Sequence, residues 1–365
     1  MPTRTAIAAC AGIALILATT FPTKADDQTL LIELDARSGA LASAVSASGS
    51  VVVGGLDNGG AFYWMPTTGV VFAGGVTADG VSGDGRTIVG WARDALGIQQ
   101  AAIWQRATEW RLLGSFPNAT ACDAFLGGAT DVNTNGQVVV GFAYHSCTSV
   151  NAFKWQESTG MVDLGSSVSG RSSLAQGVSG DGTVVVGYQT RVEGFQQGAK
   201  WLGGRQELIP GADGYVGTAM AANNDGSVIV GRICRPTDET NQSAWMWRTR
   251  DGTTCLPPPR RRVSPGPVII VEAAATSDDG EVIGGSQNVG GSADSDAVIW
   301  IGGQPAYLKD FLRANGVPNA FETWVNTGTI TGISPDGRVI VGWGAARLGF
   351  RGYVIILGSS RVIPS

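Results

Sequence analysis

The sequence predicts an all-β protein, a seven-bladed β-propeller of four-stranded blades, and three observations support this prediction. A pattern of glycine, four residues and glycine recurs seven times along the 365 residues. A tryptophan follows each of the first six copies of the pattern. Hydrophobic residues make up 43% of the chain and glycines number 54, which supplies a packed core and excludes intrinsic disorder.

The chain begins with the layout of a secretory signal peptide. Arg4 supplies a positive charge, residues 6–20 are uncharged and mostly apolar, and small residues precede a cleavage point after Ala25. The apolar run is shorter than the roughly 20 residues that span a bilayer. We therefore expect residues 1–25 to be a signal peptide and residues 26–365 to form one propeller domain, secreted or periplasmic, without a transmembrane anchor.

The charge and the cysteines follow from that expectation. The formal net charge is -5, and an acidic chain does not favour nucleic acid as a partner, because phosphate binding needs basic surface. Removal of residues 1–25 takes Cys10 and leaves four cysteines. An even number in an oxidising compartment predicts two disulfides, and spacing alone allows three ways of pairing them.

The third copy shows the repeating unit in full. Four apolar segments, residues 129–133, 138–140, 152–155 and 161–164, are expected to be strands a to d. Asn135-Gly136 between the first two is a strong hairpin signal, since glycine accepts the positive φ of such turns. Strand b is apolar at successive positions, which indicates cover on both faces.

Units that need cover on both faces are satisfied by stacking in a ring, as in a propeller. A straight solenoid is the alternative, but it needs polar caps on its end repeats, and the sequence shows none. The chain stops after a strand c at residues 352–357, and a surplus strand at residues 30–34 precedes the first copy. We expect these two strands to pair, which would close the ring and cover both edges.

The unit resembles the HAF-type extracellular repeat of secreted bacterial proteins. Residues 151–187 carry its pattern most closely: Ala152-Phe153-Lys154-Trp155, then Gly160-Met161, then Ser179-Gly180-Asp181-Gly182 and Val184-Val185-Val186-Gly187. The resemblance covers essentially all of residues 30–357. It implies export and a β-propeller-like repeat fold, and it implies no activity and no cofactor, because the repeat carries no known catalytic residues.

Strand order places the a–b and c–d turns on one face of the ring and the b–c and d–a loops on the other. We call the second face the variable face, because its loops differ in length and content and are where function usually lies. Cys122 and Cys147 fall in such loops of the third copy, and Cys234 and Cys255 fall in or run toward such loops of the fifth. We therefore expect the disulfides Cys122–Cys147 and Cys234–Cys255.

The residue after each strand-b glycine is expected where that strand reaches the variable face. In chain order these residues are Gly55, Trp91, Phe142, Tyr188, Arg232, Ser286 and Trp343. Four are aromatic, which is consistent with packing between blades or with platforms for a sugar or another flat ligand. The candidate ligand-binding residues are Trp91, Phe142, His145, Tyr188, Arg232 and Trp343.

Other motifs indicate little chemistry. The spacing supplies no carboxylate partner for His145, so it is expected to be a solvated loop residue. The Asp-Gly pairs are interpreted as turn residues rather than calcium boxes, and Arg260–Arg262 as an exposed loop that an acidic partner would contact. No phosphate-binding loop, dinucleotide fingerprint, zinc spacing or nucleophile elbow is present, which predicts no metal and no cofactor.

Two functions follow as hypotheses. The first is a secreted, non-enzymatic binding or interaction scaffold for a glycan, a cell-surface component or a protein. The alternative is a secreted polysaccharide-active hydrolase or lyase that uses acids such as Asp123, Glu193 or Asp238 on the variable face. A purely structural envelope protein is a third hypothesis. The sequence leaves the ligand and the oligomeric state open.

Overall fold

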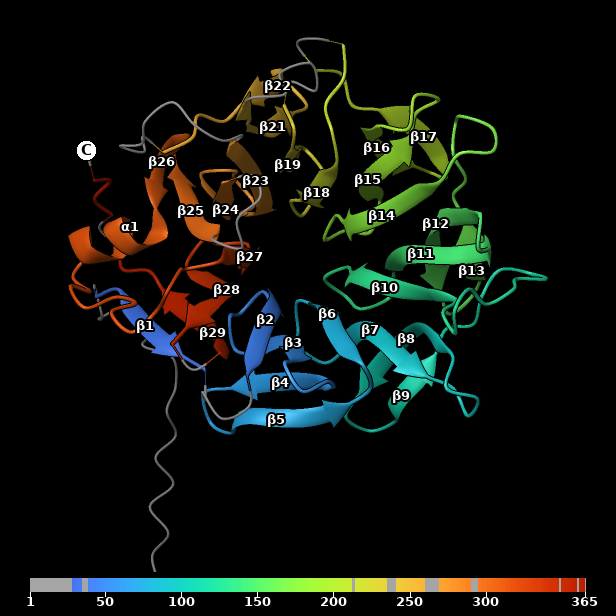
Figure 1. The fold of residues 1–365 in the computed structure, drawn as a ribbon, viewed down its shortest axis with the longest axis horizontal. Helices are drawn as coiled ribbons and strands as arrows, with labels where there is room; N and C mark the ends of the chain where they lie inside the picture. The colour runs from blue at the N-terminus through green and yellow to red at the C-terminus, as the bar shows by residue number, and fades with distance from the viewer. Residues whose placement is uncertain are drawn as a thin grey trace, which may run out of the picture.

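The computed structural model describes residues 28–34, 39–211, 214–234, 241–259, 269–289, 295–347, 349–359 and 361–364. The expected signal peptide lies outside these ranges. The described chain is all-β apart from one short helix, α1 (Leu308–Ala314). Its sheets are arranged around a central axis (Figure 1). No helix within these ranges is long and apolar enough to cross a membrane.

The first four copies of the repeat each form one four-stranded antiparallel sheet in chain order. The strands are β2 (Ala40–Val45), β3 (Val52–Leu56), β4 (Ala61–Met65) and β5 (Gly69–Gly74); β6 (Thr77–Val81), β7 (Ile88–Arg93), β8 (Gln99–Gln105) and β9 (Glu109–Leu112); β10 (Gly127–Val132), β11 (Val139–Ser146), β12 (Ser149–Gln156) and β13 (Gly160–Asp163); and β14 (Ser173–Val178), β15 (Val184–Thr190), β16 (Gln196–Leu202) and β17 (Arg205–Leu208).

The fifth and sixth copies share one nine-stranded sheet. The fifth copy supplies β18 (Ala219–Ala222), β19 (Val228–Arg232), β21 (Ala244–Arg248) and β22 (Gly252–Cys255), and the sixth supplies β23 (Ile269–Thr276), β24 (Val282–Val289), β25 (Ser295–Ile301) and β26 (Gln304–Tyr307). The two sets are joined where Arg232 pairs with Glu272 and through the two-residue strand β20 (Asn241–Gln242), which pairs with β23.

The last sheet combines the two ends of the described chain. Its order is β1 (Leu30–Glu33), β29 (Gly349–Ile356), β28 (Val339–Ala346) and β27 (Thr329–Ile333). The strand β1 runs antiparallel to β29, with Leu30 opposite Ile356 and Ile32 opposite Val354. These are the two segments for which the sequence predicts pairing, and β1 supplies the last copy with its fourth strand.

The first strand of each copy lies nearest the axis (Figure 1). Each contacts the first strand of the next copy, in the order β2, β6, β10, β14, β18, β23, β27 and back to β2. Each of these strands carries a β-bulge near its middle, at one register position. Bulges increase the local twist and bend of a strand.

The core lies between neighbouring sheets, as the unbroken apolar second strands predict. Val52 packs with Val339 and Val341 of the last copy. Its neighbour Val53 packs with Ile88 of the second copy. Both valines are fully buried, because adjacent residues of a strand point to opposite faces and each face meets another sheet.

The Asp-Gly turns are held by a repeated pair of side-chain hydrogen bonds. In the second copy the Ser82 hydroxyl accepts the Thr87 N–H at 3.0 Å and donates to the Asp84 carboxylate at 2.6 Å. Gly85 follows with a φ of 72°, in the left-handed region that glycine adopts freely. The hydrogen bond from Ser82 lowers the pKa of Asp84 below its usual value. These aspartates therefore serve the turns.

Candidate functional site

Two of the predicted ligand-binding residues belong to an aromatic cluster on the variable face. The Trp91 ring lies 4.8 Å from Phe125 and 6.1 Å from Phe142, centroid to centroid. Tyr144 extends the cluster at 5.8 Å from Phe125. The indole covers Gly128, where an added Cβ would lie 2.2 Å from its nitrogen. The half-buried rings therefore bind the second copy to the third, and the Trp91 Nε1 has no hydrogen-bond partner among the described residues.

Two further predicted residues belong to a polar cluster formed by the fourth to sixth copies. Arg232 donates from Nη2 to Gln196 at 3.1 Å and lies 3.8 Å, through Nη1, from the Glu272 carboxylate. Ser286 donates to the same carboxylate at 3.2 Å. The Arg232 Nε is buried and has no partner within the described residues. Burial raises the pKa of the adjacent Tyr188, while Arg232 lowers it in part.

The other two predicted residues have separate surroundings. His145 pairs with Asp163 at 2.9 Å and stacks on Phe116 at 4.4 Å. His145 therefore has a carboxylate partner that sequence spacing did not reveal. The two paired side chains are 36% and 35% exposed. Trp343 packs edge-on against Phe350 at 5.5 Å. The contacts of the six predicted residues therefore fall into an aromatic cluster, a polar cluster and the separate surroundings of His145 and Trp343.

Both predicted disulfides, Cys122–Cys147 and Cys234–Cys255, are present. Cys122 also exchanges two backbone hydrogen bonds with Phe125, at 2.8 and 2.9 Å. The first disulfide therefore fixes the loop that places Phe125 in the aromatic cluster. Structural disulfides form in oxidising compartments, so the pair indicates an extracytoplasmic protein.

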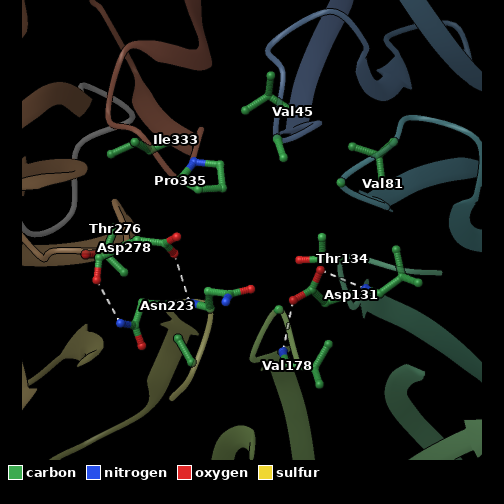
Figure 2. A pocket seen from close by; sticks show the side chains of 16 residues that line it. Val45, Val81, Asp131, Thr134, Val178, Asn223, Thr276, Asp278, Ile333 and Pro335 are labelled. Carbon is green, nitrogen blue, oxygen red and sulfur yellow. Dashed lines mark hydrogen bonds between the residues drawn. The ribbon is translucent and has the colours of Figure 1, made fainter. Parts of the chain in front are cut away.

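Sequence reasoning missed a second site, a central cavity on the face opposite the variable face. Figure 2 shows the first strands and their turns converging on it, and its volume is about 130 Å³. All seven copies contribute to its lining, which includes Val45, Val81, Asp131, Thr134, Val178, Asn223, Thr276, Asp278, Ile333 and Pro335. The lining mixes apolar and polar side chains, and its two charged residues are Asp131 and Asp278.

Asp131 links the third copy to the fourth. Its carboxylate accepts the N–H of Val132 at 2.8 Å and the N–H of Val178, on the next first strand, at 2.9 Å. Enclosure by protein raises the pKa of Asp131 to about 6, although the two hydrogen bonds act in the opposite direction. Burial also raises the pKa of Asp79, one copy earlier, to about 6, and Thr77 donates to it at 2.5 Å.

A comparison of the seven copies would have revealed Asp131. The register places it directly after the bulge, at a position where the other six copies have Ala44, Gly80, Gly177, Ala221, Ala275 and Gly332. A shifted pKa is typical of functional sites, but structural networks produce it too. Here both carboxylate oxygens hold backbone N–H groups, so the geometry is that of a clamp between strands.

Backbone hydrogen bonds join neighbouring turns around the cavity mouth. Ala47 donates to Gly83 at 3.1 Å, Gly83 to Thr134 at 2.9 Å, and Thr134 to Gly180 at 3.0 Å. In the last copy the corresponding residue is Pro335, which accepts from the sixth copy but has no N–H to donate onward to the first. The series of turn-to-turn donors therefore ends where the two ends of the repeat array meet.

The acids proposed for catalysis have little support in their surroundings. Asp123 is exposed in its loop, with a φ of 48°. Glu193 is exposed and lies 3.0 Å from Arg191, whose hydrogen bond holds the pKa of that carboxyl below its usual value, opposite to what a general acid needs. Asp238 and Arg260–Arg262 lie outside the described residues. Among the residues described, no cluster of three or more His, Cys, Asp or Glu suits a metal.

No family model and no curated protein matches the sequence. Among solved structures, the β-propeller domain of the Trilobed protease from Pyrococcus furiosus matches with a TM-score of 0.53 and 11% identity, over 90% of this chain and 97% of that domain. Hydrazine synthase from Kuenenia stuttgartiensis matches at 0.50 and 12%, over 90% of this chain and 96% of that one.

TolB from Acinetobacter baumannii matches at 0.47 and 11%, over 73% of this chain, which spans only 62% of the TolB chain. Identities of this size show the fold and nothing about activity. The likeness to the P. furiosus domain, together with the four-stranded antiparallel sheets around one axis, shows that this chain has a β-propeller fold.

Proposed function

We propose that this protein is a secreted or periplasmic, seven-bladed β-propeller of HAF-type repeats that acts as a non-enzymatic binding scaffold. The closed series of contacts among the seven first strands supports the blade count, with the nine-stranded sheet counted as two blades. The pairing of β1 with β29 supports closure by the N-terminal strand. The two disulfides and the signal-like residues 1–25 support export.

The ligand in this proposal is a glycan or another surface component, bound on the variable face. The observation that carries it is a pair of unsatisfied donors, the Trp91 Nε1 and the Arg232 Nε, at the position after the strand-b glycine. Both atoms are covered by protein, but buried donors in native structures almost always have a partner, so we infer that a shift of these half-buried side chains brings the donors to a ligand or water. An indole beside aromatic rings and a guanidinium beside a carboxylate suit a sugar, which presents both apolar C–H faces and hydroxyls.

A glycan array followed by product analysis tests this proposal. We expect binding without turnover, and at least about tenfold weaker binding after Arg232→Gln, since a buried charged hydrogen bond contributes roughly 1.5–3 kcal/mol. Arg86→Gln is the matched control, because Arg86 lies on the opposite face with its side chain 86% exposed. Binding that Arg232→Gln leaves unchanged would refute this site. New reducing or unsaturated ends in the products would instead show that the protein is a polysaccharide-active enzyme, the alternative function.

A further inference from the structure

Large apolar side chains project from the loops of the variable face. Five such side chains of the described residues are more than 60% exposed: Leu96 at 84%, Val325 at 66%, Val192 and Phe72 at 65%, and Phe195 at 63%. All except Phe72 lie on b–c or d–a loops. Single exposed apolar residues are normal on a surface, but their concentration on one face marks an interaction site.

Rigid turns hold these side chains away from the sheets. In the second copy Asp94 donates its N–H to Ile98 and accepts from Gly97, both at 3.0 Å, which leaves Leu96 at the tip. In the fourth copy Arg191 donates to Phe195 at 2.8 Å and accepts from Gly194 at 3.0 Å in the same turn.

The turn geometry does not require apolar residues. The first copy makes the same turn from Leu56 to Gly60, with both equivalent hydrogen bonds at 2.9 Å. Its tip carries the polar pair Asp57-Asn58 instead. The fold therefore does not explain the exposed apolar side chains of the second and fourth copies, which indicates that they contact another molecule.

The last copy supplies a third tip. Val325 is pinned beside β28 by a 2.7 Å backbone hydrogen bond to Ala345, and Phe350, 42% exposed, leans on Trp343. The hairpins β7–β8, β15–β16 and β28–β29 occupy three separate sectors of the ring (Figure 1). All three tips project from the same face, which suits contact with an extended surface.

Each tip is accompanied by a guanidinium group. Arg93 donates to the Gly97 carbonyl at 2.9 Å, and Arg171 donates to the Val192 carbonyl at 2.7 Å. Arg347 is exposed at the base of the third tip. Within the described ranges none of the three has a carboxylate within 4 Å, although the chain has 30 acids against 25 bases.

Two of the acids beside the tips are engaged in local contacts, while Asp123 and Glu322 are exposed on the same face. The Asp94 carboxylate accepts the backbone N–H groups of Leu96 and Ile98, and Glu193 is paired with Arg191. Apolar tips beside cationic groups are the combination by which peripheral proteins insert into an interface and contact anionic headgroups.

We propose that the variable face docks on an anionic lipid surface, with the three apolar tips inserted into the interface and Arg93, Arg171 and Arg347 contacting headgroup phosphates. The tip residues and the three arginines are separate from the donors assigned to the glycan, Trp91 and Arg232. An experiment can therefore refute membrane docking without refuting glycan binding, and the reverse.

Sedimentation of the full mature chain with phosphatidylcholine vesicles, with and without phosphatidylglycerol, tests the proposal. We expect binding only when phosphatidylglycerol is present, weakening as salt rises. The triple variant Leu96→Ser, Phe195→Ser, Val325→Ser should bind at least about tenfold more weakly, because it removes most of the inserted apolar area. Replacing the three arginines with glutamine should abolish the salt dependence.

Two matched variants complete the experiment. Leu202→Ser removes an exposed apolar side chain at the end of β16, beside a c–d turn on the opposite face, and should leave binding unchanged. Asn58→Leu places an apolar residue on the polar tip of the first copy and should strengthen binding. Thermal unfolding checks that every variant folds. A wild-type chain that ignores phosphatidylglycerol vesicles, a triple variant that binds equally well, or a dimer that the triple variant disrupts would overturn the proposal.

Discussion

The Asp131 carboxylate should make the protein less stable as the pH rises. Burial raises the pKa of Asp131 from 3.8 to about 6, so the folded state binds this proton more tightly than the unfolded state. The stability that the group contributes is therefore fully present below pH 3.8 and is lost as the pH rises through about 6. A difference of about two pKa units corresponds to about 3 kcal/mol.

The substitution Asp131→Asn isolates this effect. The amide does not titrate, but its NH2 group cannot accept one of the two backbone N–H groups that Asp131 holds, so the variant should be less stable than the wild type near pH 4. Because the wild type loses up to about 3 kcal/mol as the pH rises and the variant does not, the gap between them should narrow by up to that amount at pH 7. Asp79 retains its own raised pKa, so part of the pH dependence should persist in the variant.

Urea unfolding followed by tryptophan fluorescence between pH 4 and 7 measures the difference. Asp225→Asn provides a control of opposite sign, because a hydrogen bond from Ser227 lowers the pKa of this exposed carboxyl. The stability that ionised Asp225 contributes is present above pH 3.8 and is lost as the pH falls. The Asp225→Asn variant should therefore be less stable than the wild type at neutral pH only. Parallel stability curves for the wild type and Asp131→Asn would refute a raised pKa of Asp131 in the folded state.

Three further predictions concern stability and are read from urea or thermal unfolding. Gly128→Ala should destabilise by about 2 kcal/mol, because the new Cβ meets the Trp91 indole; an unchanged midpoint would mean that the ring is free to move. Replacing Cys122 and Cys147 with serine opens a 25-residue loop and should cost about 3 kcal/mol, and equal stability under reducing and oxidising conditions would contradict it. Ser179→Ala leaves a buried strand-b N–H without its acceptor and should cost about 2 kcal/mol, against a negligible effect for the exposed Ser48→Ala.

The features that the sequence predicted correctly depend on local pattern. The Asn135-Gly136 turn and the apolar triplet after it identify the first two strands of a copy within a dozen residues. Strand order then places the loops, and this placement alone selected Cys122–Cys147 among the three allowed pairings. Geometry that follows from chain order can be read without knowing how the sheets pack.

The features that the sequence did not predict depend on packing between elements. The partner of His145 is Asp163, which lies two strands away across the sheet, so no spacing rule connects them. Phe125 enters the aromatic cluster only because the disulfide loop folds back toward β7. Helix α1 interrupts the strand pattern, and its buried Leu308 and Phe311 join the core of the last copies.

Departures from the repeat carry more information about a site than the repeat itself. The first strands approach so closely that a Cβ on Gly80 would lie 3.0 Å from the Asp131 backbone, which explains why most copies keep glycine or alanine at this position. A residue shared by every copy can only build the symmetric ring. A ligand that is not itself seven-fold symmetric must be recognised by residues that break the symmetry, and Asp131 and Pro335 at the central cavity and Arg232 on the variable face are such residues.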